Sequence, residues 1–150
     1  MPTGVTPKGV CLGHTNRWIN SLIESLDAQV DEETRAKILE NCGRNCISRN
    51  FIAKAQTLKK NSKDMDDFLE KLGRNWKHLK RKGEAVYVMY DKCYCPLVKD
   101  HKGKLSPTFC NCSRGWIKEL FESILNKPVE VKLEKSIKQG DEICRFKLSL

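Results

Sequence analysis

Apolar residues recur at helical spacing along the first half of the chain. One stripe follows the intervals i, i+1, i+4, i+5 and i+8 and predicts an amphipathic helix that begins near Thr15. Its apolar members are Trp18, Ile19, Leu22, Ile23 and Leu26. A second helix is predicted to begin at Asp31, because Asp is a favoured N-cap residue and two glutamates follow it. Its apolar side is expected to carry Ile38, Leu39, Cys42 and Cys46.

The helical pattern continues beyond Cys46. The segment SRNFIAKAQTLKK is compatible either with a new helix or with a bent continuation of the second one. A clearer helix is predicted to begin at Ser62 and to end at Gly83, since glycine commonly follows the last helical turn. Its inward residues are expected to be Met65, Phe68, Leu69, Leu72, Trp76 and Leu79. Acidic residues open this helix and the basic run RNWKHLKRK, residues 74–82, closes it, which is the order that the helix dipole favours.

The hydrophobic period changes in the second half of the chain. AVYVMY, residues 85–90, is rich in β-branched and aromatic residues, which predicts a strand. Ser113 is predicted to cap a further helix that ends at Pro128. The inward residues of that helix are expected to be Trp116, Leu120, Phe121, Ile124 and Leu125.

The last segment alternates between apolar and polar residues, as a half-buried hairpin does. The apolar positions before the turn Gln139-Gly140-Asp141 are Val129, Val131, Leu133 and Ile137, and those after it are Cys144, Phe146, Leu148 and Leu150. Together the elements predict an α+β fold with a twisted antiparallel sheet and helices packed on one face. Residues 1–150 are expected to form a single domain, with helices over about 14–82 and a strand, a helix and a hairpin over about 85–150.

The net charge and the expected cellular compartment both bear on the predicted function. The chain shows no signal peptide and no apolar run long enough for a membrane span, which predicts a cytoplasmic protein whose eight cysteines stay reduced. The net charge of +9 suggests nucleic-acid binding, but a solvated helix end explains residues 74–82 and no recognition motif accompanies them. Nucleic-acid binding is therefore kept only as a third alternative. The oligomeric state stays open, with a homodimer as one option.

Six of the cysteines form three close pairs, which are Cys42 with Cys46, Cys93 with Cys95, and Cys110 with Cys112. Residues i and i+2 of a strand point the same way, and so do residues i and i+4 of a helix, so each pair can present two sulfurs to one point. Four cysteines are a usual composition for a closed zinc site, and a sulfur-rich site also accepts an iron-sulfur cluster. The sequence predicts a metal site, with zinc first, and leaves several four-ligand sets open.

Two other interpretations of the thiols stand beside the metal site. Free cysteine packs as a small hydrophobe, so the thiols can be reduced core residues, and Cys144 fits that role or the lining of a pocket. Nucleophilic catalysis needs a base, and His14, three residues after Cys11, gives the best pair for a thiol-dependent hydrolase or redox enzyme. His78 and His101 are expected to be exposed.

The C-terminal stretch CNCSRGWIKELFESILNKPVEVKLEKSIKQGDEICRFKLSL resembles the closing part of a 4-vinyl reductase domain. That family is marked by a cysteine before a glycine and an aromatic residue, a helix, a "pVeV…E" strand and a final "GD…CrF". The matching residues here are Cys110 or Cys112, Gly115, Trp116, Pro128, Val129, Glu130, Val131, Glu134, Gly140, Asp141, Cys144, Arg145 and Phe146. The resemblance covers about a quarter of the chain.

The resemblance implies an α+β domain related to the haem-nitric-oxide-binding and vesicle-tethering folds, with a pocket for a small hydrophobic ligand and a sensory or accessory role. Trp116, Phe146 and Cys144 would line that pocket. Ile137 stands where the family often has a cysteine, and the N-terminal portion departs from the family pattern, which indicates a separate bacterial branch. Aminothiazoline-carboxylate hydrolases look similar at the same end and keep the enzymatic alternative open. The leading hypothesis is a cytoplasmic small-molecule-binding or sensory domain with a cysteine-rich metal site.

Overall fold

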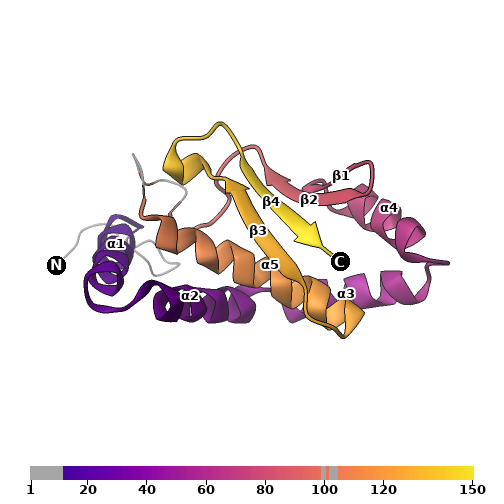
Figure 1. Cartoon of the computed structure of the whole chain (residues 1–150), viewed down its shortest axis with the longest axis horizontal. Coiled ribbons are helices and arrows are strands. Elements are labelled where there is room, and N and C mark those ends of the chain that lie inside the picture. The colour runs from indigo at the N-terminus through magenta and orange to yellow at the C-terminus, as the bar shows by residue number, and fades with distance from the viewer. Residues whose placement is uncertain (1–11, 99–100, 102–104) are drawn as a thin grey trace.

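The computed structural model describes residues 12–98, 101 and 105–150. Its elements are α1 (Leu12–Gln29), α2 (Glu32–Cys46), α3 (Arg49–Lys60), α4 (Met65–Asn75), β1 (Leu79–Lys82), β2 (Ala85–Tyr90), η1 (Pro107–Phe109), α5 (Cys110–Leu125), β3 (Glu130–Lys135), η2 (Ile137–Gln139) and β4 (Cys144–Ser149). The two η elements are short 3-10 turns. In Figure 1, α2, α3 and α5 run along the lower side of the sheet and α1 lies at the far end from α3 and α4.

The strands form one antiparallel sheet in the order β1-β2-β4-β3. β1 with β2 and β3 with β4 are hairpins, and the pairing of β2 with β4 joins the two hairpins into one sheet. Alternate strand residues pack against the helices, with Val88 fully buried and Phe146 nearly so. The predicted α+β architecture, an antiparallel sheet with helices packed on it, is confirmed.

Side-chain caps explain where the helices of the first half begin. Asp31 accepts a hydrogen bond from the backbone N–H of Thr34 at 2.9 Å, as predicted. Ser48 accepts one from Phe51, so residues 49–60 form a helix of their own rather than a bent continuation. The cap of α4 is Asp64, not Ser62 as predicted.

The prediction of a helix that runs to Gly83 is wrong beyond Asn75. Leu79 begins β1, which pairs with β2, and Gly83 adopts a φ of +60°, a left-handed conformation that suits a tight hairpin turn. Pairing with the neighbouring strand therefore overrides the helical spacing of the apolar residues. Lys80 and Lys82 consequently lie on a strand and not at a helix end.

The start of α5 also differs from the prediction. Cys110 and Cys112 are not extended but lie in the first turn of the helix, so the cap is not Ser113. The 3-10 turn η1 leads into α5, with Pro107 at its first position and the Ser106 hydroxyl accepting from the backbone N–H of Thr108 at 3.3 Å.

The apolar stripes of α1 and α2 are only partly buried. Ile23 is buried, but Trp18 keeps 59% of its surface exposed and Leu22 keeps 40%. On α2, Leu39 is buried while Ile38, Cys42 and Cys46 are exposed. The buried side of α2 is instead shared by Leu39 and Gly43, a position that apolar spacing does not mark.

Two glycines let the backbones of α2 and α5 touch. A Cβ on Gly43 would overlap the carbonyl group of Cys112, and a Cβ on Gly115 would overlap the carbonyl group of Glu40. The contact is reciprocal, because each helix supplies a glycine to the backbone of the other. Any side chain at either position would force the helices apart.

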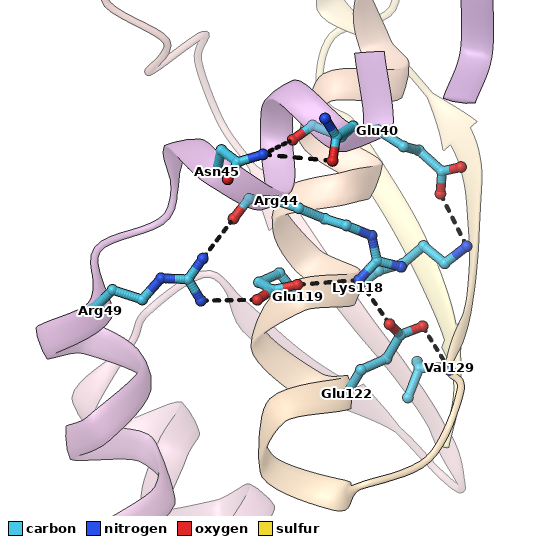
Figure 2. Close-up of polar contacts among 9 residues, drawn as sticks. Glu40, Arg44, Asn45, Arg49, Lys118, Glu119, Glu122 and Val129 are labelled. Carbon is cyan, nitrogen blue, oxygen red and sulfur yellow. Dashed lines mark hydrogen bonds and ion pairs between the residues drawn. The ribbon is translucent and has the colours of Figure 1, made fainter. Parts of the chain in front are cut away.

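Ion pairs flank this glycine contact (Figure 2). Arg44 of α2 donates to Glu119 at 3.2 Å and to Glu122 at 2.7 Å, and Arg49 donates to Glu119 at 2.8 Å. Lys118 lies 2.9 Å from Glu40 on the other side. The pairs of Arg44 with Glu119 and Glu122 are only partly exposed and help to hold α2 and α5 in one rotational setting. Arg49, which is more exposed, adds a contact from α3.

We predict that Gly43→Ala and Gly115→Ala each lower the free energy of unfolding by about 2 kcal/mol, because the added methyl overpacks the contact. The loss exceeds the gain of up to ~1 kcal/mol that alanine brings to a helix. Urea unfolding followed by circular dichroism measures both. Gly73→Ala is the matched control, since a Cβ there meets only the Leu79 carbonyl oxygen at 3.7 Å, and it should be neutral or stabilising. Equal behaviour of the three variants would contradict the close contact.

The carboxylates of this network predict a loss of stability in acid. Burial raises the pKa of Glu122, but hydrogen bonds from Arg44 and from the Val129 N–H outweigh it and leave the pKa below its ordinary value. A lowered pKa contributes stability above the unfolded pKa of about 4.3 that is lost as pH falls through the lower, folded value.

Glu122→Gln should therefore flatten the stability profile below about pH 4.5 and cost about 1 kcal/mol at neutral pH. Unfolding midpoints measured across the acid range test this. The control is Glu33→Gln, because Glu33 forms a fully solvated pair with Lys37 and should leave the profile unchanged. Parallel profiles for Glu122→Gln and the wild type would rule out this role.

Candidate functional site

A cavity of about 350 Å³ lies where α2 ends, α5 begins and β2 leaves the sheet. Thiols from four separate parts of the chain line it: Cys46 of α2, Cys93 and Cys95 after β2, Cys110 and Cys112 of α5, and Cys144 of β4. The structure thus brings five of the six predicted metal ligands to one space and adds Cys144. Cys42 does not line the cavity and is exposed on α2.

Aromatic rings form much of the remaining wall. Trp116 and Phe146, both predicted to line a pocket, do so, together with Trp76, Tyr90 and Tyr94. The Trp76 and Trp116 ring centroids are 5.7 Å apart, and Tyr90 meets Phe146 edge to face at 6.4 Å. Such a wall suits a small ligand with apolar or aromatic surface.

The glycine contact between α2 and α5 positions the thiols. Gly43 lies between Cys42 and Cys46 in sequence and faces the backbone of Cys112 and Trp116. The two helices approach so closely that the C-terminal turn of α2 and the first turn of α5 share one side of the cavity. A more distant packing would separate Cys46 from Cys112.

Neighbouring thiols help to raise the pKa of Cys112 and of Cys95 at this side of the cavity. Burial, followed by the charges of ionised Cys95, Cys46 and Cys42, raises the pKa of Cys112 to about 12. The pKa of Cys95 is raised by burial first and then by Cys93 and Cys46. We call Cys42, Cys46, Cys95 and Cys112 the α2 thiol group.

The other three thiols lie near the start of β4 and form the β4 thiol group: Cys93, Cys110 and Cys144. Burial raises the pKa of Cys110, whose sulfur lies 3.2 Å from the Ser136 hydroxyl. Burial also raises the pKa of Cys144, which accepts a hydrogen bond from the Ile137 N–H at 3.3 Å. Buried thiols with raised pKa values are mostly protonated at neutral pH, and a protonated thiol is a poor nucleophile.

The sulfurs are near one another but are not set as a finished metal cage. Among the described residues, no group of three or more His, Cys, Asp or Glu side chains is arranged to hold a metal ion. A metal-binding set would need thiol side chains to turn toward a common point. Each cysteine has one rotatable side-chain bond that moves its sulfur, and metal sites are rarely preformed before the metal binds.

His78 lines the cavity, which the sequence analysis missed. It precedes β1 and is half-buried, with its ring 4.7 Å from that of Tyr90 and 4.8 Å from that of Tyr94. Its Nδ1 lies 3.1 Å from the Met89 carbonyl oxygen, which only accepts, so the hydrogen is assigned to Nδ1. Burial lowers the pKa of His78 despite that hydrogen bond, so the ring is neutral at pH 7 and Nε2 keeps its lone pair.

His78 was predicted to be exposed because residues 79–82, which form β1, were predicted to be helical. Assigned to a helix end, His78 was expected to be exposed, whereas a strand that begins at Leu79 places it against the cavity. The signal available in the sequence was Gly83 before the strand-like AVYVMY, which marks a hairpin.

Of the other two histidines, His101 is more buried than predicted and His14 is exposed. His101 is half-buried rather than exposed, with its Nδ1 3.0 Å from the Asn20 side-chain nitrogen and its carbonyl oxygen accepting from Lys138. His14 is exposed on α1. Its suggested partner Cys11 lies outside the described residues, so that pair stays a prediction.

A larger and more polar cleft of about 770 Å³ lies between α1, α2, α5 and β3. Asp27 there accepts a hydrogen bond from Thr108 at 2.6 Å and lies 3.3 Å from Arg35. These groups satisfy one another, and none of the predicted site residues lines the cleft. The thiol-lined cavity is therefore the candidate site.

Comparison with known proteins identifies a family but no activity. None of the described helices is long and apolar enough to cross a membrane. No curated protein matches the chain. The profile of a family of unknown function, DUF6144, matches residues 10–150, which includes every residue of the cavity. The chain belongs to the DUF6144 family.

Proposed function

We propose that this protein is a small-molecule-binding or sensory domain whose cavity takes up a thiophilic metal ion, with zinc first. The observation that supports the proposal is the convergence of six thiols from four chain segments on one cavity of about 350 Å³. An isolated buried cysteine would be an ordinary core residue, but six cysteines around one space, five half-buried and one exposed, are difficult to explain by packing alone. Thiolates are the ligands that zinc and other soft metals prefer.

The α2 thiol group is the favoured ligand set: Cys46, Cys95 and Cys112 line the cavity, and Cys42, exposed on α2 beside it, would have to turn toward them. Cys42 and Cys46 are one helical turn apart, and the Cys112 carbonyl touches Gly43 between them. Cys95 supplies the fourth sulfur from the segment after β2. The charges of neighbouring thiols help to raise the pKa of Cys112 and Cys95, and a bound cation would reverse that cost of ionisation.

The aromatic wall supports a second ligand, small and apolar. The volume is near the lower end of the range for small-molecule pockets, so a ligand the size of a single ring system fits best. A metal ion beside such a wall would let the ligand coordinate the metal or lie against it. Binding of the metal and binding of the ligand would then depend on each other, as a sensory domain requires. The family relationship to 4-vinyl reductase domains stays a prediction and is compatible with this proposal.

The thiol-dependent hydrolase is less well supported by the cavity. The pKa values of Cys110, Cys112 and Cys144 are raised, whereas a nucleophilic cysteine needs a lowered one or an adjacent base. The imidazole of His78 donates its hydrogen bond to the Met89 carbonyl oxygen rather than to a thiol. An iron-sulfur cluster remains an alternative occupant of the same thiols. A cytoplasmic location, where thiols stay reduced, is part of the proposal.

Metal binding is tested by titrating reduced, metal-free protein with Co²⁺ and then displacing the cobalt with Zn²⁺. We expect the sulfur-to-cobalt charge-transfer band of a thiolate site, and an affinity that rises with pH because the raised thiol pKa values oppose deprotonation. Cys112→Ser should weaken binding about 100-fold. Cys144→Ser, which removes a cavity thiol of the β4 group, is the matched control and should bind nearly as the wild type does.

Absence of the charge-transfer band with all thiols reduced would refute the metal site. Visible absorption from iron and sulfide in anaerobically purified protein would instead identify an iron-sulfur cluster as the occupant in place of zinc.

Thiol labelling gives an independent prediction for metal-free protein. A pKa of about 12 in place of about 8.5 lowers the thiolate fraction of Cys112 at pH 8 by a factor of roughly a thousand. Alkylation followed by peptide mass spectrometry should therefore label the exposed Cys42 early and Cys112 only after unfolding. One cavity thiol that reacts faster than Cys42 would point to an activated nucleophile and favour the hydrolase.

A further inference from the structure

The outer face of the sheet carries one row of paired residues across all four strands, with lysines on β1, β4 and β3 and a tyrosine on β2. Lys80 pairs with Tyr87, Tyr87 with Lys147, and Lys147 with Lys132. Their neighbours along each strand, such as Val86 and Phe146, point into the core, so the row lies on the opposite face of the sheet. Lys132, on the edge strand β3, also borders the polar cleft. The three lysines are exposed.

Further basic residues extend the row on the same face. Lys82 is exposed on β1 and Lys135 is exposed on β3. Arg145 pairs with Met89 across the strands, is held by Glu134 at 2.7 Å and lies 5.7 Å from the centre of the Tyr87 ring. The face therefore combines an aromatic ring, a guanidinium beside it and lysines on both sides.

This arrangement costs stability unless an anion is present. Like charges directly opposite each other on neighbouring strands repel, and Lys132 and Lys147 are such a pair. Among the described residues, no carboxylate lies within ion-pair distance of Lys80, Lys132 or Lys147. Residues 74–82 were expected to close a helix, and a solvated helix end would explain their charge. Residues 80–82 instead lie on β1, so a helix end does not explain their charge.

We propose that this sheet face binds single-stranded nucleic acid, with the lysine row against the phosphates and Tyr87 stacked on a base. A four-stranded sheet face is too broad to enter the major groove of a duplex, which admits a helix or a two-stranded ribbon, whereas an extended single strand can lie across such a face. Tyr87 and Arg145 offer planar groups that stack on bases, and an acidic peptide or a lipid headgroup would have no use for them. The face is opposite the thiol cavity, so this proposal does not depend on metal binding.

The test is fluorescence anisotropy with a labelled single-stranded 12-mer of mixed sequence. With three lysines on phosphates, the logarithm of the affinity should fall with the logarithm of salt concentration with a slope of about −2. The triple variant Lys80→Gln, Lys132→Gln, Lys147→Gln should reduce the slope toward zero and lower the affinity at low salt at least about tenfold. Tyr87→Ala should lower it about fivefold or more, and Tyr87→Phe should not.

The control variant removes the same number of positive charges from surface positions outside the sheet. Lys54, Lys60 and Lys127 are exposed and lie outside the strands, and their replacement by Gln should leave binding nearly intact. The unfolding midpoint of the sheet variant shows that it folds, and removal of the Lys132–Lys147 repulsion should leave that midpoint equal or higher. Absence of binding at low salt, an equal loss in the control variant, or equal affinity for a duplex or for polyglutamate would overturn the proposal.

Discussion

The backbone contact between α2 and α5 is the constraint on which the rest of the structure depends. Gly43 and Gly115 each occupy the space that a side chain would fill, so the helices meet at a distance set by main-chain atoms. α5 in turn packs on the sheet through Ile117, Leu120 and Phe121, all fully buried. The position of α2, and with it one wall of the cavity, is thereby fixed relative to the strands.

The sequence predicted those parts of the fold that depend on local patterns. Composition identified β2, alternation identified the β3–β4 hairpin, and Asp31 identified the start of α2, because all three are properties of neighbouring residues. It failed at β1, where Leu79 continues a helical spacing by coincidence and only pairing with β2 decides the conformation. It also missed the role of Gly43, since a close contact with a helix some seventy residues away leaves no local signal.

The candidate site, like the fold, could be predicted from the sequence only in part. Pairing of cysteines in sequence pointed to thiols that meet, and the structure brings Cys46, Cys93, Cys95, Cys110 and Cys112 to one cavity. The geometry behind that expectation was wrong for Cys110 and Cys112, which lie on a helix and not on a strand. Cys144 lines the cavity, as the sequence predicted, whereas His78 enters only through tertiary packing. Burial of both explains chemistry that spacing cannot show: a neutral imidazole and a protonated thiol.

The strand order has a consequence for how the chain folds. β1 with β2 and β3 with β4 are hairpins that need only local contacts, but β2 with β4 joins residues 86–90 to residues 144–148. That central pairing closes the longest loop in the sheet, and loops of that length form slowly. α5 lies within the loop and packs on the same sheet. Its docking therefore brings the two ends of the loop closer together before β2 and β4 pair. We expect the hairpins to form early and the sheet to become continuous only when α5 has docked, which makes the pairing of β2 with β4 the step that sets the folding rate.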